Sequence, residues 1–274
     1  MSNHSQFDVH VVSPSYWKVT FENAPINLID LDTVEQLADL VTRIEQDPDL
    51  TVVVFQSANP DFFMAHLDLL MDKERAAAMP LGPTGLPLVS DNLLRLSKVP
   101  AVTISAINGR VRGAGSEFVL STDIRFAGPD AILGQPEVGI GAVPGGNPMG
   151  RLAELVGRGR AMEIVLGGDD FPARLAAEYG YVNRVLPEGE LDDFVDAFAR
   201  RIAGFDKAAI SGTKEFVDAA TTIPASDYAA ALVAFRRTAG RPESADRVRG
   251  LFTRGFQQPQ GIELDLGRSI AEKA

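Results

Sequence analysis

The first half of the chain alternates short β-branched or apolar runs with segments in which apolar residues recur at helical spacing. Runs of the first kind are typical of strands, and they cover residues 9–12, 17–21, 51–55, 101–105 and 123–127. A helix is expected after the second run, and Asp32 can cap it. The apolar residues of this helix share one face: Val34, Leu37, Leu40, Val41 and Ile44. Strands alternating with helices predict an α/β fold in which helices cover the sheet.

Past residue 150 the pattern becomes mostly helical, with one candidate strand at 181–186. The expected helices cover residues 159–167, 173–180, 190–204, 206–220, 227–240 and 243–255. We therefore predict a core over residues 1–190, which holds the candidate chemistry, and a helical region over 191–274. An amphipathic helical tail on an α/β core often buries its surface against another subunit.

Composition narrows the possible chemistry. Hydrophobic residues make up 45% of the 274 residues and charged residues 23%, which is typical of a globular protein. The net charge of −11 and the lack of a basic stripe argue against nucleic-acid binding. The chain has no cysteine, and its three histidines are scattered, so neither a thiol nucleophile nor a metal site is expected. Acid–base chemistry therefore falls mainly to carboxylates.

No segment of the sequence predicts export or membrane insertion. The start, MSNHSQFDVH, lacks a basic segment followed by an apolar run, and no apolar stretch reaches the roughly 18 residues of a membrane span. We expect no membrane partner and a cytoplasmic location.

The segment 108-NGRVRGAGSEFVLSTD-123 places a glycine-rich turn between a strand ending near Asn108 and a helix starting near Ala114. The free N–H groups and dipole of the first helical turn favour a developing negative oxygen there. Glu117 lies in that turn. The alternative is that the glycines only allow close packing and Glu117 caps the helix. A dinucleotide site is not indicated, because Phe118 stands where the third glycine of that fingerprint would fall.

Two further segments carry candidate polar residues. In 131-AILGQPEVGIGAVPGGNP-148, Glu137 is the only charge among apolar residues, so desolvation would raise its pKa toward a value useful for proton transfer. The alternative is an acid on a solvent-facing turn. In 59-NPDFFMAHLDLL-70, His66 by itself indicates a buried, hydrogen-bonded histidine and Asp68 a helix cap.

Taken together and in this order, these segments resemble the crotonase superfamily, the enoyl-CoA hydratase/isomerase family, over nearly the whole chain. Its A-G-A-D-[LI] segment is similar to residues 65–69, its N-G-x-x-x-G-G-G-x-E segment to 108–117, and its G-Q-P-E-x-x-x-G-x-x-P-G segment to 134–145. Weaker matches cover residues 22–27, 159–168 and 172–187.

The resemblance implies an α/β crotonase-like spiral of repeated ββα turns, followed by a C-terminal helical trimerisation region. It implies a homotrimer or homohexamer that binds an acyl-CoA thioester. Coenzyme A would then be part of the substrate, with no separate cofactor and no metal.

The resemblance also assigns roles to residues. The backbone N–H groups of Leu67 and Ala114 would form an oxyanion hole for the thioester oxygen. Glu117 and Glu137 would hold a water that adds to C3 of a trans-2-enoyl-CoA, with Glu137 delivering a proton to C2. The reverse reaction is dehydration of a 3-hydroxyacyl-CoA. Residues matching the same motifs would bind substrate or CoA: Ala65, His66, Asp68, Leu69, Gly113, Pro136 and Gly145.

Four departures from the family pattern leave alternatives open. Leu67 and Ala114 occupy donor positions where smaller residues are usual, although any residue except proline keeps its backbone N–H. His66 replaces a glycine beside the first oxyanion donor, and Arg112 replaces a small residue, where it could meet an anionic group of the ligand, a salt-bridge partner or solvent. Pro148 would stiffen a glycine-rich loop. Hydration is therefore the leading hypothesis. The alternatives are another crotonase reaction (isomerisation, retro-aldol cleavage or thioester hydrolysis) and a non-catalytic acyl-CoA-binding oligomer.

Overall fold

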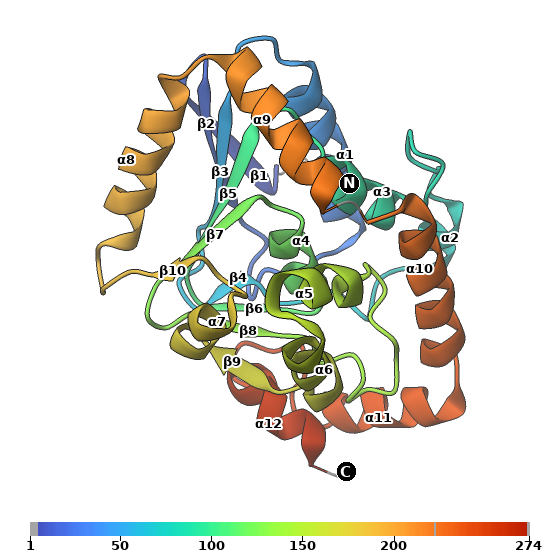
Figure 1. Cartoon of the computed structure of the whole chain (residues 1–274). Coiled ribbons are helices and arrows are strands. Elements are labelled where there is room, and N and C mark those ends of the chain that lie inside the picture. Colours follow the sequence, from blue (N-terminus) through green and yellow to red (C-terminus); the bar gives the residue numbers. More distant parts are fainter. Residues whose placement is uncertain (1–4, 222, 273–274) are drawn as a thin grey trace.

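The computed structural model describes residues 5–221 and 223–272 and shows an α/β fold (Figure 1). A six-stranded sheet has the order β1-β2-β3-β5-β7-β10. Its strands are β1 (Phe7–Ser13), β2 (Tyr16–Phe21), β3 (Val52–Ser57), β5 (Val102–Ile107), β7 (Ile124–Ala127) and β10 (Arg184–Val185). The predicted strands are confirmed, but the run 181–186 forms only the two-residue β10. Residues 181–183 instead form the turn that follows α7 (Ala173–Tyr179), where the Tyr181 N–H donates to the Ala176 carbonyl.

The sheet is parallel except for the antiparallel pair β1 and β2. Parallel strands are covered on both faces, which explains the continuous apolar run at the start of β3, where Val52, Val53 and Val54 are all buried. The helix α1 (Leu31–Gln46) joins β2 to β3 and buries the predicted apolar stripe. The predicted cap was wrong. Asp30 accepts a hydrogen bond from the Thr33 N–H (2.8 Å), whereas Asp32 lies in the first turn and pairs with Arg75.

A second, four-stranded sheet was not predicted. Its order is β4-β6-β8-β9, with β4 (Phe62–Met64), β6 (Arg110–Arg112), β8 (Ile132–Gly134) and β9 (Asp170–Pro172). The first three strands are parallel to one another, and each has only three residues, too few for a periodic pattern. All three candidate segments leave the carboxyl ends of these three strands. In parallel sheets such ends are the usual place for ligand sites.

Short helices connect the strands of the two sheets. They are α2 (Lys73–Ala78), α3 (Leu88–Leu96), α4 (Ala114–Leu120), α5 (Pro148–Val156), α6 (Arg158–Gly167) and α7. The interpretation of Pro148 as a loop-stiffening residue was wrong, because it is the first residue of α5. A proline is favourable there, since its missing N–H would have had no partner in the helix.

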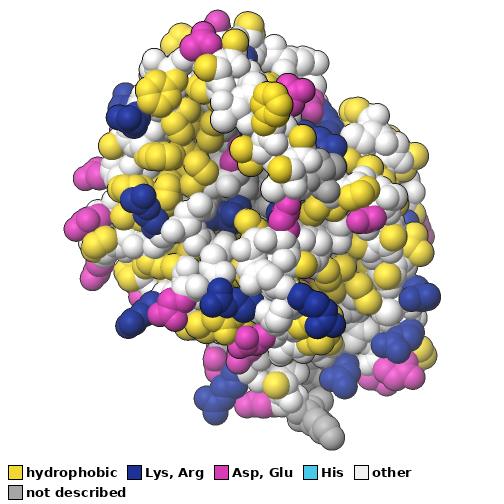
Figure 2. All heavy atoms as spheres, in the orientation of Figure 1, with side chains coloured by type: hydrophobic (Ala, Val, Ile, Leu, Met, Phe, Trp, Pro, Cys, Tyr) yellow, Lys and Arg dark blue, Asp and Glu magenta, His cyan; other side chains and the backbone are white. Residues whose placement is uncertain are grey.

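The C-terminal part consists of α8 (Leu191–Ala203), α9 (Lys207–Ala220), α10 (Ala225–Ala239), α11 (Pro242–Phe252), the 3-10 helix η1 (Ile262–Asp265) and α12 (Leu266–Ala271). α8 packs on the sheet, whereas α9 buries none of its residues. Figure 2 shows hydrophobic side chains gathered on the surface between α8 and α9. The chain then returns to the second sheet, where α12 contacts β9. The division into residues 1–190 and 191–274 stays a prediction.

No helix within residues 5–221 and 223–272 is both long and apolar enough to cross a membrane.

Candidate active site

Gly113 is the point at which the three segments meet. Its φ of +50° lies in a region that L side chains rarely adopt. A Cβ at this position would lie 2.8 Å from Glu137 Oε1 and 3.5 Å from His66 Cβ. The absence of a side chain at Gly113 therefore allows the loop after β4, the start of α4 and the loop after β8 to come together.

Glu117 lies in the first turn of α4 and is 5% exposed. Its Oε1 accepts a hydrogen bond from the Gly146 N–H (2.8 Å), and a Cβ on Gly146 would overlap the other carboxylate oxygen. Burial raises the pKa of Glu117 to about 7, although the bond from Gly146 opposes this rise. Because its carboxylate accepts from Gly146 and not from an N–H of α4, Glu117 does not cap its own helix.

Glu137 is 9% exposed, so it is not an acid on a solvent-facing turn. Its Oε2 is buried and has no hydrogen-bond partner. Burial, and then the negative charge of Glu117, raise the pKa of Glu137 well above its ordinary value. Because the charge of Glu117 opposes ionisation of Glu137, the two carboxyl groups ionise in succession, and the pair holds its last proton to a higher pH than an isolated glutamate would.

Two backbone N–H groups belong to the neighbours of His66 and Gly113, which lie close together. Ala114 is the first residue of α4, where N–H groups have no partner within the helix. The carbonyl of His66 accepts from the Ile29 N–H (2.9 Å), so the Leu67 N–H of the same trans peptide points away from Ile29. Among the described residues, neither the Leu67 nor the Ala114 N–H has an acceptor. Both are free to donate to a ligand.

His66 is buried and hydrogen-bonded, as predicted from the sequence. Its Nδ1 lies 2.9 Å from the Leu67 carbonyl oxygen and its Nε2 3.0 Å from Glu263 Oε1. Its ring stacks on Phe256, with 4.7 Å between the ring centroids. The side chain thus points toward the C-terminal part of the chain.

Asp68 and Leu69 contact the same C-terminal part. The predicted helix cap at Asp68 was wrong, because no helix starts there; its Oδ1 accepts from the Leu70 N–H (2.8 Å) and from Gln257 Nε2 (2.6 Å). The Leu69 N–H donates to Gln257 Oε1 (3.0 Å).

Arg112 forms a buried salt bridge, the second of the possibilities left open by the sequence. Its guanidinium donates to both carboxylate oxygens of Asp170 (2.6 and 2.7 Å) and to the Glu263 carbonyl (2.8 Å). The side chain is 1% exposed. Arg112 therefore joins β6, β9 and the C-terminal segment.

The remaining predicted binding residues border the same region. Ala65 is buried, with its N–H donating to the Asn27 carbonyl and its carbonyl accepting from the Arg112 N–H. Pro136 precedes Glu137, and its carbonyl accepts from the Gly139 N–H. Gly145 packs on Phe235 of α10. Whether they contact substrate stays a prediction.

Three residues that contact the predicted site were missed. Gly146 lies in the segment 131–148, but its contact with Glu117 depends on the fold and has no signal in the sequence. Gln257 and Glu263 lie 188 to 197 residues after their partners in the loop that follows β4. The sequence holds no local signal that pairs positions so far apart.

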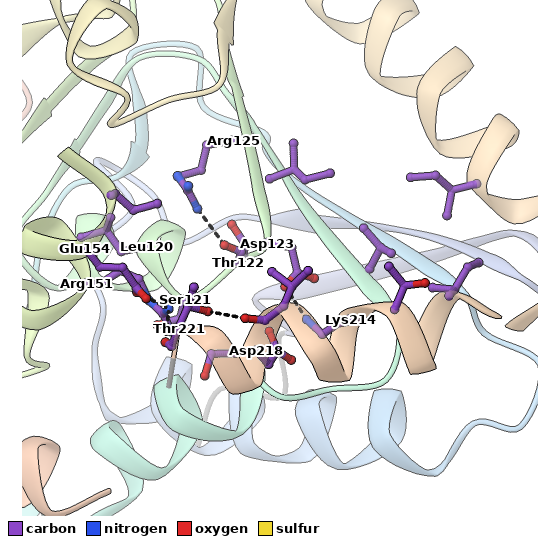
Figure 3. Close-up of a pocket in the computed structure, with 18 of the residues that line it drawn as sticks. Leu120, Ser121, Thr122, Asp123, Arg125, Arg151, Glu154, Lys214, Asp218 and Thr221 are labelled. Atoms are coloured by element: carbon purple, nitrogen blue, oxygen red, sulfur yellow. Dashed lines mark hydrogen bonds and ion pairs between the residues drawn. The ribbon is translucent and has the colours of Figure 1, made fainter. Parts of the chain in front are cut away.

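Two cavities differ in their relation to the glutamates. A small one, of about 30 Å³, is lined by Ala114 and Glu117 together with Ile29, Thr33, Val34, Leu37, Met64, Val89, Asn92, Leu93 and Phe118. A larger one, of about 820 Å³, lies between α9 and the carboxyl-terminal end of α4 (Figure 3). Lys214 of α9 pairs there with Asp123. Neither Glu117 nor Glu137 lines the larger cavity.

Within the part of the chain that the structure describes, no three His, Cys, Asp or Glu side chains are grouped so that they could hold a metal ion.

A buried carboxyl pair that holds a proton beside two free backbone N–H groups is suited to enzymes that form an enolate from a carbonyl compound. The comparisons agree with this class. Residues 13–243 match the sequence model of the enoyl-CoA hydratase/isomerase family, so the chain belongs to that family.

Individual relatives are consistent with this assignment. The chain is 30% identical to the short-chain-enoyl-CoA hydratase of Clostridium acetobutylicum over 70% of this chain and 73% of that protein. It is 31% identical to the crotonyl-CoA hydratase of Syntrophomonas wolfei over 72% and 75%, respectively. The crystal structure of a candidate enoyl-CoA hydratase from Streptomyces avermitilis superposes with a TM-score of 0.93 at 38% identity, covering 100% of this chain and 99% of that one. The predicted family and α/β crotonase-like fold are confirmed.

Proposed function

We propose that this chain is an enoyl-CoA hydratase that adds water across the C2=C3 bond of a trans-2-enoyl-CoA. The observation that carries the proposal is the buried pair Glu117 and Glu137, which retains a proton beside the free N–H groups of Leu67 and Ala114. The family match and the hydratase names of the relatives confirm the prediction of an enoyl-CoA hydratase-type enzyme. The roles of individual residues are part of the proposal.

The two N–H groups would donate to the thioester oxygen of the substrate. Adding water to C3 moves electrons toward this oxygen, so the fixed donors stabilise the enolate-like transition state more than the ground state. Removal of one such donor typically costs about 3–4 kcal/mol of transition-state stabilisation. The ligand would then be an acyl-CoA thioester.

The two glutamates would carry the protons. Glu117 ionises first and so acts as the base that takes a proton from water as its oxygen bonds to C3. Glu137 keeps its proton because of burial and the charge of Glu117, and it donates that proton to C2. Hydration involves no net electron transfer, so this scheme needs no redox cofactor, and coenzyme A enters only as part of the substrate.

The small cavity beside Ala114 and Glu117 favours a short acyl chain. Its volume of about 30 Å³ leaves room for about two water molecules or a methyl group beyond C3. The name of the Clostridium relative, a short-chain-enoyl-CoA hydratase, agrees with this inference.

A direct test incubates the purified protein with crotonyl-CoA and with longer and aromatic enoyl-CoAs, and follows the loss of enoyl thioester absorbance. We expect turnover that is fastest with crotonyl-CoA. The double variant Glu117→Gln/Glu137→Gln serves as the control for adventitious activity. Absence of hydration of every enoyl-CoA by a protein that still binds CoA would overturn the proposal.

A homotrimer or homohexamer is part of the proposal. In α9, Phe216 is 82% and Val217 58% exposed, and Phe205 before it is 52% exposed, which is unusual for side chains of this size unless another surface covers them. Light scattering should give three or six times the mass of one chain, and Phe216→Glu should shift the protein to smaller species. A wild-type monomer at micromolar concentration would contradict this assembly.

A cytoplasmic location is also retained as a proposal, which fractionation of cells that produce the untagged chain would test.

A further inference from the structure

The Leu67 N–H is held by the two peptide groups that flank it. On one side, the His66 carbonyl accepts from the Ile29 N–H (2.9 Å). On the other, the Asp68 N–H donates to the Ile29 carbonyl (2.9 Å), and the Leu67 carbonyl faces His66 Nδ1 (2.9 Å). The imidazole of His66 is the only side chain with a hydrogen bond to the backbone of Leu67 among the described residues.

Both ring nitrogens of His66 face hydrogen-bond partners. A carbonyl oxygen can only accept, so Nδ1 must carry a proton. Nε2 faces the Glu263 carboxylate. Burial acts to raise the pKa of Glu263, but the hydrogen bond and charge of His66 and the bond from the Gln257 N–H outweigh it, so this pKa is lowered. An ionised Glu263 accepts only, so both hydrogen bonds of the ring form together only when each of its nitrogens carries a proton.

Glu263 is itself fixed from several directions. Its Oε1 accepts from the Gln257 N–H (2.7 Å) as well as from His66, and its carbonyl accepts from Arg112 Nη1 (2.8 Å). The side chain of Gln257 bonds to the Leu69 N–H and to Asp68. We call Phe256, Gln257 and Glu263 the C-terminal clasp, because they hold residues 66–69 from one side.

We propose that the ion pair between His66 and Glu263 is a positioning device that holds the Leu67 N–H in the direction required for the thioester oxygen. The inference rests on the proposed function, because it assigns that N–H to the thioester. His66 and Glu263 act through Leu67 and take no part in proton transfer to the substrate. The C-terminal clasp thereby becomes part of the oxyanion hole.

Glu263→Gln is the sharpest variant, because it keeps the shape of the side chain and removes only its charge. Glu263 Oε2 has no partner, so an amide nitrogen can occupy its position without breaking a bond. The amide cannot turn its NH2 toward the ring, since it would then face the Gln257 N–H. Without a carboxylate beside it, the imidazole no longer has a partner for a positive charge, and a neutral imidazole carries a proton on only one nitrogen. The Leu67 carbonyl and the amide oxygen then compete for that single N–H, so we expect the bond to the Leu67 carbonyl to weaken.

The primary readout is the infrared C=O band of bound butyryl-CoA labelled at the thioester carbon. Butyryl-CoA lacks the double bond, so this measurement does not depend on hydration. We expect wild-type protein to move the band to lower frequency and Glu263→Gln to lose most of that shift. An equal shift in both proteins, or no shift in the wild type, would overturn the inference.

Kinetics provide a second readout. With crotonyl-CoA, we expect Glu263→Gln to lower kcat by about ten- to a hundredfold with little change in KM, because the donor acts mainly in the transition state. A merely structural role would lower the melting temperature and leave kcat per folded molecule unchanged. Glu272→Gln, which removes a surface carboxylate of the same C-terminal part, is the matched control and should leave both readouts unchanged.

A double-mutant cycle tests whether the two residues act as one unit. His66→Asn keeps an N–H near the Nδ1 position but loses the link to Glu263. We expect the double variant His66→Asn/Glu263→Gln to be no slower than the slower single variant. Additive losses would contradict the proposal. Failure of wild-type protein to hydrate any enoyl-CoA would instead count against the proposed function, and the infrared shift would still decide the role of the pair.

Discussion

The site contains buried glutamates in two contrasting environments. Glu117 accepts from the Gly146 N–H and Glu137 Oε2 has no partner, whereas Glu263 accepts from both His66 and Gln257. All three are less than one-tenth exposed. Yet the pKa of Glu117 and of Glu137 is raised, and the pKa of Glu263 is lowered. Hydrogen-bond partners, more than burial, determine which carboxylate keeps its proton.

This contrast separates two tasks within one small region. The poorly partnered pair can exchange protons with a ligand, and the well-partnered Glu263 keeps a fixed charge that holds the backbone. The two environments meet at Gly113, next to both Glu137 Oε1 and His66 Cβ. Changes to the poorly partnered pair should therefore remove proton transfer, whereas changes around Glu263 should alter the direction of the Leu67 N–H and the stability of the fold.

The largest effect is expected from the poorly partnered pair. Glu137→Gln removes the proposed proton donor, and Glu117→Gln removes the proposed base, so each should lower kcat by about a hundred- to ten-thousandfold. Steady-state kinetics with crotonyl-CoA measure the loss. The double variant should lose little more than the slower single one, because the two proton transfers belong to one addition reaction. A loss below threefold in either single variant would assign the chemistry to other residues.

The next effect tests the well-partnered side. Arg112→Met would leave Asp170 and the Glu263 carbonyl without their buried donor. Breaking such a pair typically costs about 3–5 kcal/mol, and we expect a loss in the lower part of that range because Asp170 is partly exposed. Urea unfolding measures the free energy. Arg174→Met, at a side chain 91% exposed, is the matched control and should change it by less than about 0.5 kcal/mol. Equal effects at both positions would contradict the structural role of Arg112.

The pH dependence of stability should have opposite signs on the two sides. The pKa of Glu117 rises from 4.5 to about 7 on folding, so its burial penalty appears between these pH values and is complete above them. Glu117→Gln should therefore raise the free energy of unfolding by up to about 3 kcal/mol at pH above about 7, and by nothing below about pH 4.5.

Glu263 should show the reverse. Its folded pKa is lowered, so it stabilises the fold at neutral pH and loses this contribution as the pH falls through that value. Glu263→Gln should destabilise the protein at neutral pH and differ little from wild type in acid. Denaturant unfolding at several pH values measures both variants. The same sign for both at neutral pH would refute the contrast.

The smallest effect concerns the cavity beside Glu117. Val89 lines it, and Val89→Ala should enlarge it, raising kcat/KM for hexenoyl-CoA relative to crotonyl-CoA by about tenfold. Competition between the two substrates measures the ratio. Val11→Ala makes the same chemical change at an exposed position and should leave the ratio unchanged. An unchanged ratio in Val89→Ala would show that the acyl chain lies elsewhere.

Much of this arrangement could be predicted from local patterns. The strands of the large sheet and the start of α4 near Ala114 follow from short-range signals such as apolar runs and glycine-rich turns. For Glu137 these signals left burial and a solvent-facing turn as alternatives, and the structure shows burial. The roles of both glutamates and of Leu67 were predicted instead from the resemblance to the crotonase superfamily. Periodicity could not reveal β4, β6, β8 and β9, because three residues do not define a period.

The remaining features depend on tertiary contacts. Asp30 and Asp32 are equally suited by type to cap α1, and only the backbone conformation selects Asp30. The partners of Arg112 and His66 lie more than fifty residues away in the sequence. A single sequence does not show which of its 37 acidic residues will meet a given cation.

The bond between His66 and Glu263 joins residues 197 positions apart, which has a consequence for biosynthesis. During translation, the strands and both glutamates emerge long before Glu263. A nascent chain can therefore fold its sheets while the loop around Leu67 still lacks its anchor. The oxyanion hole would be completed only after Glu263 has left the ribosome, well after the strands and both glutamates have had the chance to fold.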